Sequence, residues 1–156
     1  MGKGKSLTSP VMTEVLFDEM YSIPLKGNVR LESLTDSKTL HLQWYGILSH
    51  EDHTRFANMT IDYIVQRQAK NWIGDVSHII EPLPVDIAYY IADTWFPEAV
   101  KAGIEKLAII GPSVEKVNPS TSKIAELLAQ KHGELLKTFP LKGFNNREEA
   151  RQWVCT

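Results

Sequence analysis

The densest group of side chains able to bind a metal or move a proton is His50-Glu51-Asp52-His53. His50 and His53 are three residues apart, a spacing that places both imidazoles on one side of a helix, where they could share a metal ion. The sequence names no third ligand, and acidic residues are also common in a first helical turn because they face its exposed N–H groups. We therefore favour a solvated helix start over a metal site, and we expect no cofactor.

A second polar group lies in the segment Ile73–Ser77, where Asp75 stands between apolar residues of an expected strand. A buried carboxylate needs partners. Asp75 could line a ligand crevice at the carboxyl end of a sheet, but we favour a structural role in which it accepts from a helix start or a backbone N–H. Ser77 and His78 offer a nucleophile and a base, yet no acid is placed to orient the histidine, so we do not predict an enzyme.

Aromatic residues gather on two further segments, and side chains with an apolar body and a polar tip are frequent in ligand pockets and interfaces. Together with Asp75 they form the expected ligand or partner surface: Trp44, Tyr45, Tyr89, Tyr90, Trp95 and Phe96. Tyr89 and Tyr90 are the strongest interface candidates, because adjacent helical residues cannot both face one core.

These residues belong to elements that the hydrophobic pattern predicts. In Thr39–Gly46, Leu40, Leu42 and Trp44 alternate with polar residues, which is typical of a strand with one face on a core. Gly46 lets the chain turn, and Ser49 is a good N-cap for a helix over His50–Lys70.

The rest of the chain alternates between strand and helix patterns. Residues 11–25 are left open between a short helix and an edge strand. The other predicted elements are a hairpin strand over Asn28–Asp36, a strand over Asn71–Ile80, a helix from an Asp86 cap to Gly103, a strand over Lys106–Gly111, a helix from Ser120 or Thr121 to Gly133, a strand over Leu135–Leu141, and a helix over Arg147–Val154 capped by Asn145 or Asn146. The order ββαβαβαβα predicts one α/β domain with a mixed, mostly parallel sheet.

Length and composition limit the function. The 156 residues fit one domain, which we place at 28–156 after an arm or extension over 1–27. A net charge of −2 argues against nucleic acid as a partner. Cys155 is the single cysteine, which fits a reducing cytoplasm. The sequence has no apolar run near the ~20 residues that cross a bilayer, so we expect no integral membrane association.

Several short motifs, taken with this element order, resemble the SpoIIAA-like branch of the STAS superfamily over roughly residues 28–154. The motifs are Leu40-x-Leu42-x-Trp44-Tyr45-Gly46, Ile73-Gly74-Asp75-Val76-Ser77, Asp93-Thr94-Trp95-Phe96-Pro97 with Gly103, Lys106-Leu107-Ala108, and Phe144 with Glu148-Glu149-Ala150-x-x-Trp153. The resemblance implies a small domain without catalytic residues. More distantly, the chain is similar to CRAL-TRIO carriers of lipophilic molecules.

One departure from the family pattern matters. The anti-sigma-factor antagonists of this superfamily carry an Asp-Ser-Ser-Gly motif, whose phosphorylated serine switches partner binding, where this chain reads Glu81-Pro82-Leu83-Pro84. Three functions stay open. The first is binding to a protein partner or a second copy through the aromatic surface. The second is carriage or sensing of a small lipophilic ligand between the helix near Tyr90 and the sheet. An enzyme built on His50, His53 or Asp75 comes third.

Overall fold

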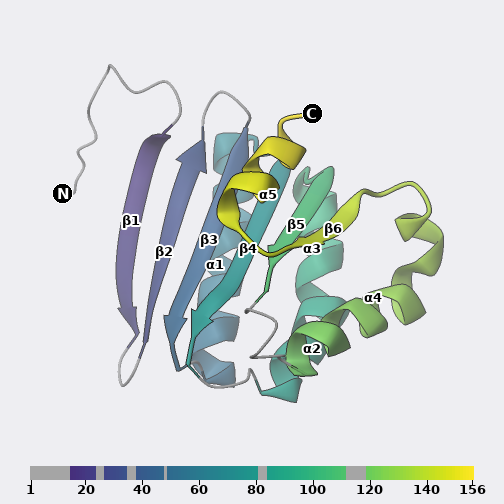
Figure 1. Ribbon diagram of the computed structural model, residues 1–156, viewed down its shortest axis with the longest axis horizontal. Coiled ribbons are helices and arrows are strands. Elements are labelled where there is room, and N and C mark those ends of the chain that lie inside the picture. The colour runs from purple at the N-terminus through teal and green to yellow at the C-terminus, as the bar shows by residue number, and fades with distance from the viewer. Residues whose placement is uncertain (1–14, 24–26, 35–37, 48, 81–83, 112–118) are drawn as a thin grey trace.

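A single mixed sheet organises the chain. The computed structural model describes residues 15–23, 27–34, 38–47, 49–80, 84–111 and 119–156. Within them, six strands lie in chain order across the sheet: β1 (Val15–Ile23), β2 (Gly27–Leu34), β3 (Thr39–Gly46), β4 (Asn71–Ile79), β5 (Lys106–Ile110) and β6 (Leu141–Phe144) (Figure 1). β1, β2 and β3 are antiparallel neighbours, and β3 to β6 run parallel. The predicted α/β class with a mixed sheet is confirmed.

Helices cover the two faces of this sheet unequally. On one face pack α1 (His50–Arg67), α2 (Val85–Tyr90), a π-helix η2 (Ile91–Trp95), α3 (Phe96–Ala102) and α4 (Pro119–Leu136). We call this the α1 face. The other face carries α5 (Arg147–Val154), which lies across the middle of the sheet in front of β4 (Figure 1). We call it the α5 face.

The N-terminal segment that the sequence left open includes an edge strand. β1 pairs with β2 along its whole length, so part of the arm expected over residues 1–27 extends the sheet. The remainder of that arm lies outside the described residues, apart from Gly27 at the start of β2. The sequence also predicts a hairpin turn over residues 35–38, of which the structure describes only Lys38, with a positive φ of 53°.

Local sequence signals place the first helix correctly. Gly46 has a φ of 85°, which a residue with a side chain rarely adopts, and it ends β3. The Ser49 side chain then accepts a hydrogen bond from the Asp52 N–H at 3.1 Å, as an N-cap does. Gly103, with a φ of 128°, ends α3 as predicted. The structure therefore confirms the predicted strand-turn-helix unit around residue 46.

Three predicted boundaries are wrong. α2 begins at Val85 directly after Pro84, so Asp86 lies inside its first turn instead of capping it. α4 begins at Pro119, so Ser120 and Thr121 are likewise inside the helix. The strand expected over 135–141 is also misplaced: α4 breaks at His132 (φ −132°, ψ 31°), next to the predicted helix end at Gly133, but helical structure then continues to Leu136, and β6 starts only after Pro140.

The α5 face is buried at β3, which the sequence did not indicate. Leu40, Leu42 and Trp44 pack on the α1 face as expected, but His41 and Gln43 on the opposite side are buried as well. The prediction of one core-facing side was wrong because α5 returns over these strands and shields their polar residues from water. A polar pattern on a strand does not require solvent when a later helix supplies its partners.

No helix in the described part of the chain is both long and apolar enough to cross a membrane.

The cap of α5 offers a test of how firmly this helix is held. Asn146 accepts a hydrogen bond from the Glu149 N–H at 2.8 Å. Asn146→Ala should lower the free energy of unfolding by about 1 kcal/mol, because the cap is lost. The matched change Asn145→Ala, one residue outside the cap, should leave the free energy of unfolding unchanged. Urea denaturation of both variants measures the difference, and equal loss would show that the cap contributes nothing.

Candidate functional site

An apolar cavity lies between the sheet and the helices of the α1 face, and its floor depends on a glycine. The paired residues Leu42, Gly74 and Ile109 form a row across β3, β4 and β5. All three line a cavity of about 80 Å³. Gly74 leaves the middle of the row without a side chain. A Cβ built at Gly74 would meet only the Trp72 indole, at 3.5 Å, so the backbone there does not require glycine.

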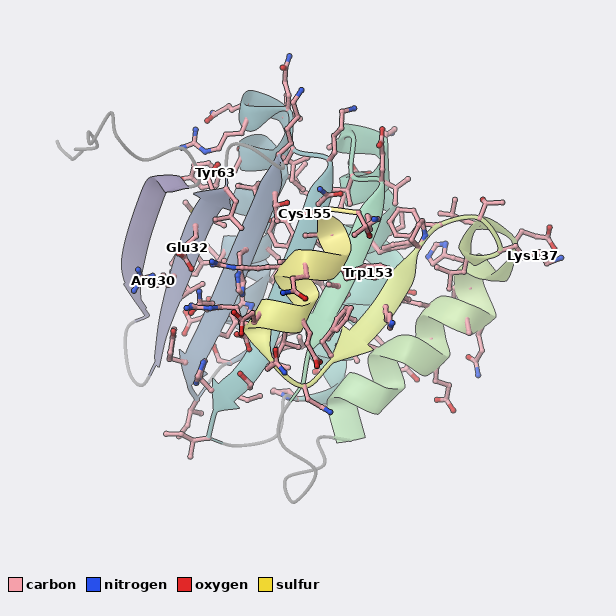
Figure 2. All side chains as sticks on the ribbon, turned by 45° about the horizontal axis from the view of Figure 1, so that its top comes forward. Arg30, Glu32, Tyr63, Lys137, Trp153 and Cys155 are labelled. Carbon is pink, nitrogen blue, oxygen red and sulfur yellow. The ribbon has the colours of Figure 1, made fainter. Side chains whose placement is uncertain are left out.

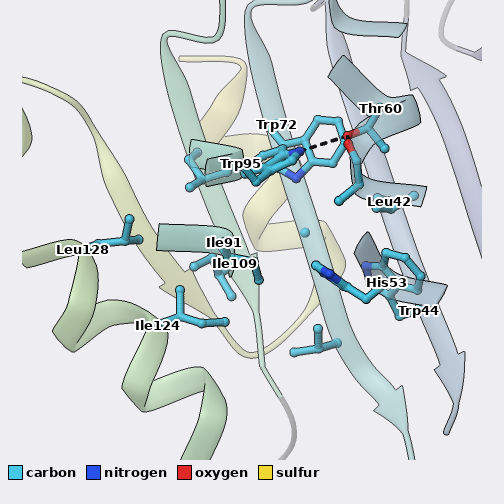
Figure 3. Close-up of a pocket in the computed structure, with 14 residues that line it drawn as sticks. Leu42, Trp44, His53, Thr60, Trp72, Ile91, Trp95, Ile109, Ile124 and Leu128 are labelled. Carbon is cyan, nitrogen blue, oxygen red and sulfur yellow. Dashed lines mark hydrogen bonds between the residues drawn. The ribbon is translucent and has the colours of Figure 1, made fainter. Parts of the chain in front are cut away.

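Three helical segments form the rest of the cavity wall, and tryptophans stand at both of its ends (Figure 3). Trp72 and Trp95 pack with ring centroids 5.0 Å apart at one end, and Trp44 lies at the other. α1 contributes His53, Ala57 and Thr60; η2 contributes Ile91 and Trp95; α4 contributes Ile124 and Leu128. Most of these side chains are buried, but Gly74, Val76, Ile91 and Ile109 are only half-buried, so the cavity lies against the core and is not fully enclosed.

The π-helix is held in place by α4. The Phe96 N–H bonds the Ile91 carbonyl in this wider turn, and Pro97 has no N–H, so the carbonyl of Ala92 is available to a side chain. His132 Nε2 lies 2.9 Å from that oxygen. Lys131 Nζ lies 2.6 Å from the Asp93 carboxylate and adds an ion pair between the same segments. The wall that carries Ile91 and Trp95 is therefore fixed from outside by polar contacts. π-Helices are rare and occur frequently at functional sites.

Two polar side chains of α1 reach the cavity, and they differ in how they are paired. Thr60 Oγ1 donates to the Ala57 carbonyl at 2.6 Å and accepts from Trp95 Nε1 at 2.9 Å. His53 Nδ1 is buried and has no hydrogen-bond partner among the described residues. Leaving such an atom unpaired costs roughly 1–3 kcal/mol. The cavity is therefore lined mostly by apolar side chains, together with a paired threonine and a histidine whose buried Nδ1 has no partner among the described residues.

Packing holds the His53 imidazole in a neutral state. The ring stacks on Trp44 at 5.0 Å between centroids and meets Tyr90 edge-on at 6.0 Å. The pKa of His53 is lowered to about 3, mainly by burial and to a smaller extent by the nearby His50. The expected solvated helix start is therefore wrong at Asp52 and His53, which are both buried. At His53 the reason is that the first turn of α1 lies over the end of β3, where Trp44 covers the ring. His50 is exposed, as expected of a solvated helix start.

The predicted aromatic set divides between several environments. Trp44 and Trp95 share the cavity, and Phe96 is buried beside them in the core. Tyr90 is half-buried and hydrogen-bonds Asn58, and Tyr89 is 41% exposed. Tyr45 lies at the far end of β3, where its ring stacks on His78 at 4.7 Å. A partner surface at Tyr89 and Tyr90 stays a prediction.

Asp75 belongs to a buried polar cluster on the α5 face, which we call the α5 cluster: Glu32, His41, Gln43, Asp75 and Arg151. Arg151 Nη2 donates to Glu32 Oε1 at 3.0 Å, and Gln43 Nε2 donates to the same oxygen at 2.5 Å. Arg151 Nε also donates to His41 Nδ1 at 3.3 Å, which leaves the imidazole proton on Nε2, 3.7 Å from Asp75 Oδ2. Figure 2 shows Glu32 on β2 beside α5.

The α5 cluster satisfies its charges internally. Burial lowers the pKa of His41, although the Asp75 carboxylate opposes this shift. Burial acts to raise the pKa of Asp75. Neighbouring His41 and two hydrogen bonds from Ser77 outweigh this effect and lower the pKa. The Ser77 hydroxyl donates at 2.6 Å and its N–H at 2.9 Å. Asp75 thus takes the structural role favoured from sequence, with a backbone N–H and a hydroxyl as partners.

Among the described residues, no three His, Cys, Asp or Glu side chains lie close enough together to hold a metal ion. His50 and His53 both face Tyr90, with ring centroids 6.4 and 6.0 Å away.

The sequence did not predict most residues of the cavity wall or of the α5 cluster. Gly74 carried a weak signal, as a glycine inside a strand pattern marks a close approach or a gap in packing. His53 was considered as part of a solvated helix start, as a metal ligand and as an enzyme residue, but not as a buried ring in the wall of a cavity. The polar residues of the α5 cluster gave no signal as a group, because Glu32, His41 and Arg151 are far apart in sequence.

A scan against protein-family models finds no model that matches this chain, and a search of curated proteins finds no significant relative.

Arg151 and Arg147 allow a matched test of the α5 cluster, since both approach Glu32 Oε1, at 3.0 and 3.9 Å. Arg151→Met should lower the free energy of unfolding by about 3 kcal/mol, because Glu32 is buried and loses its closest cation. Arg147→Met should lower the free energy of unfolding by less than about 1 kcal/mol, because the Arg147 side chain is 54% exposed. Urea denaturation measures both, and similar losses would refute a structural role for Arg151.

His53 makes a distinct contribution to the pH dependence of stability. Its pKa is about 3 in the folded state and near 6.5 in the unfolded chain, so only the unfolded chain takes up a proton between these values. Stability should therefore fall as pH drops below 6.5. Between pH 6.5 and pH 5, His53 should lower the free energy of unfolding by roughly 2 kcal/mol.

The variant His53→Phe should lack this part of the slope, while the part from His41 remains. Urea midpoints of both proteins at pH 7, 6 and 5 provide the measurement. Parallel curves for the wild type and the variant would show that His53 titrates normally in the folded protein.

Proposed function

We propose that this protein is a non-enzymatic carrier or sensor of a small apolar ligand, bound in the cavity between the sheet and α1, η2 and α4. The observation that carries the proposal is the cavity of about 80 Å³, with tryptophans at both ends and a glycine in its floor. Binding sites for small molecules are concave, mostly apolar and largely preformed. This is the second of the three functions that the sequence left open.

The size of the cavity restricts the ligand. An engineered cavity of about 150 Å³ holds benzene, so about 80 Å³ suits a molecule of only a few heavy atoms. The cavity also differs in detail from the one expected near Tyr90: Tyr90 lies outside its lining, whereas Ile91 lines it.

The relation to the SpoIIAA-like branch of the STAS superfamily remains part of this proposal. It is supported by the order of the motifs in the sequence and by the alternation of strands and helices after β3. Within that relation, the chain has no serine switch motif at residues 81–84, so ligand occupancy would be the signal that a partner detects.

The proposal predicts that filling the gap at Gly74 removes binding. Gly74→Ala adds a methyl group to the cavity floor, where it makes only ordinary contact with Trp72. The change should weaken xenon binding at least tenfold. It should also raise the free energy of unfolding by about 0.5–1 kcal/mol, because alanine restricts the unfolded chain and fills empty space. Xenon-129 NMR measures binding, and urea denaturation measures stability.

The matched control is Gly143→Ala on β6, where an added Cβ also makes only ordinary contact, 3.9 Å from the Ile109 carbonyl oxygen. Gly143 does not line the cavity, and this variant should bind xenon as the wild type does. Unchanged binding by Gly74→Ala would contradict the proposal, as would an equal loss in both variants.

A further inference from the structure

The contact between α5 and the sheet requires an unprotonated nitrogen on His41. The His41 side chain is fully buried, and its Nδ1 lies 3.3 Å from Arg151 Nε and 3.1 Å from Arg151 Nη2. A guanidinium group donates hydrogen bonds and has no acceptor, so this contact uses the lone pair of Nδ1. The neutral ring already carries its proton on Nε2. A second proton would occupy Nδ1 and leave two cations facing each other.

Charged groups from three elements surround this ring. On β2, Glu32 Oε1 accepts from Arg151 Nη2 at 3.0 Å, and on β4, Asp75 Oδ2 lies 3.7 Å from His41 Nε2. α5 supplies Arg151 and also Arg147, whose Nη1 lies 3.9 Å from Glu32 Oε1. Burial and Arg151 lower the pKa of His41, and the two carboxylates oppose them. If α5 leaves the sheet, burial and Arg151 no longer act while the carboxylates remain, so the pKa of His41 rises.

Within the described residues, α5 has few other attachments to the sheet. The helix has eight residues and is the last described element of the chain (Figure 1). Lys106 Nζ donates to the Trp153 carbonyl at 3.2 Å. A short terminal helix held in this way can open locally while the rest of the fold stays closed. Its apolar contacts form a small cluster, separate from the main core, of Ile73, Ala108, Ile110, Ala150 and Val154 with the half-buried Phe144 and Trp153.

We propose that His41 and Arg151 form a proton-sensitive latch: when His41 takes up a proton, Arg151 loses its acceptor and α5 leaves the sheet. The face that α5 covers is then exposed, including Ile73, Ala108 and Ile110, which are at most 1% exposed with α5 in place. The latch thus uncovers an apolar strip of β4 and β5 in acid. It is independent of the proposed function, because the cavity lies on the opposite face of the sheet.

A fall in pH should favour release of α5. His41 binds a proton more tightly when α5 is released than when it is attached, so acid shifts the equilibrium toward release. The ordinary pKa of a histidine is 6.5. With that value in the released state, the equilibrium constant for release should rise several-fold, and up to about tenfold, between pH 7.5 and pH 5.5.

Native-state hydrogen exchange of the full-length protein, followed by 1H–15N NMR at pH 7.5 and pH 5.5, measures this release. The probes are the N–H groups of Arg151–Val154 in α5, compared with those in the middle of α1. Protection factors are corrected for the effect of pH on intrinsic exchange. At pH 7.5 the α5 groups should be less protected than those of α1, because α5 opens alone. At pH 5.5 the α5 groups should lose a further several-fold, up to about tenfold.

Two substitutions each remove one buried imidazole. His41→Asn keeps an acceptor for Arg151 near the position of Nδ1 but does not titrate, so α5 should be equally protected at both pH values. His53→Phe is the matched control, because it removes the buried imidazole of the α1 face and acts on unfolding of the whole chain. It should retain the wild-type loss of protection in α5 and reduce the loss in α1.

Three results would overturn the latch. The first is α5 protection in the wild type that does not change with pH. The second is a pH-dependent loss in α5 that persists in His41→Asn, which would assign the effect to another group. The third is identical protection and pH dependence in α5 and α1, which would show that α5 opens only when the whole chain unfolds. The first and third results come from the wild type, so they do not depend on the folding of a variant.

Discussion

The alternation of side chains along β4 is the constraint on which the rest of the structure depends. Because β4 is central and covered on both faces, its odd and even residues must suit two different environments at once. Trp72, Gly74 and Val76 face the apolar cavity, while Asp75 on the opposite side joins the α5 cluster. One strand thus supplies the floor of the cavity and the anchor of a charged network, and a shift by one residue would exchange the two.

The two faces of the sheet are buried by different kinds of contact. On the α1 face, burial of tryptophan and aliphatic surface stabilises the fold, and the space left at Gly74 is an unfilled part of it. On the α5 face, the apolar contact is small and centres on Ile73, Ala108 and Ile110 against α5. There, Arg151 compensates for the buried charge of Glu32. Both faces hold a buried ring nitrogen without a hydrogen-bond partner among the described residues: Nδ1 of His53 on the α1 face and Nε2 of His41 in the α5 cluster.

Local signals in the sequence were enough for the strand-turn-helix unit at Gly46 and Ser49, for the ends of α3 and α5, and for the α/β class. They failed where the deciding contact is distant. His53 is buried because Trp44 covers it after the chain turns, and His41 is buried because Arg151 returns to it from the last helix. The cavity exists because Gly74 has no side chain between Leu42 and Ile109 on the two neighbouring strands, so no single segment of the sequence indicates it.

The π-helix also shows that a proline can decide which atoms of a helix a distant segment reaches. In the π turn the Phe96 N–H bonds the Ile91 carbonyl, and Pro97 has no N–H to offer the Ala92 carbonyl. That carbonyl oxygen is the one that His132 of α4 approaches. A residue with an N–H at position 97 would offer Ala92 a backbone donor that competes with His132, so the attachment of α4 is specified partly by a ring that lies in another helix.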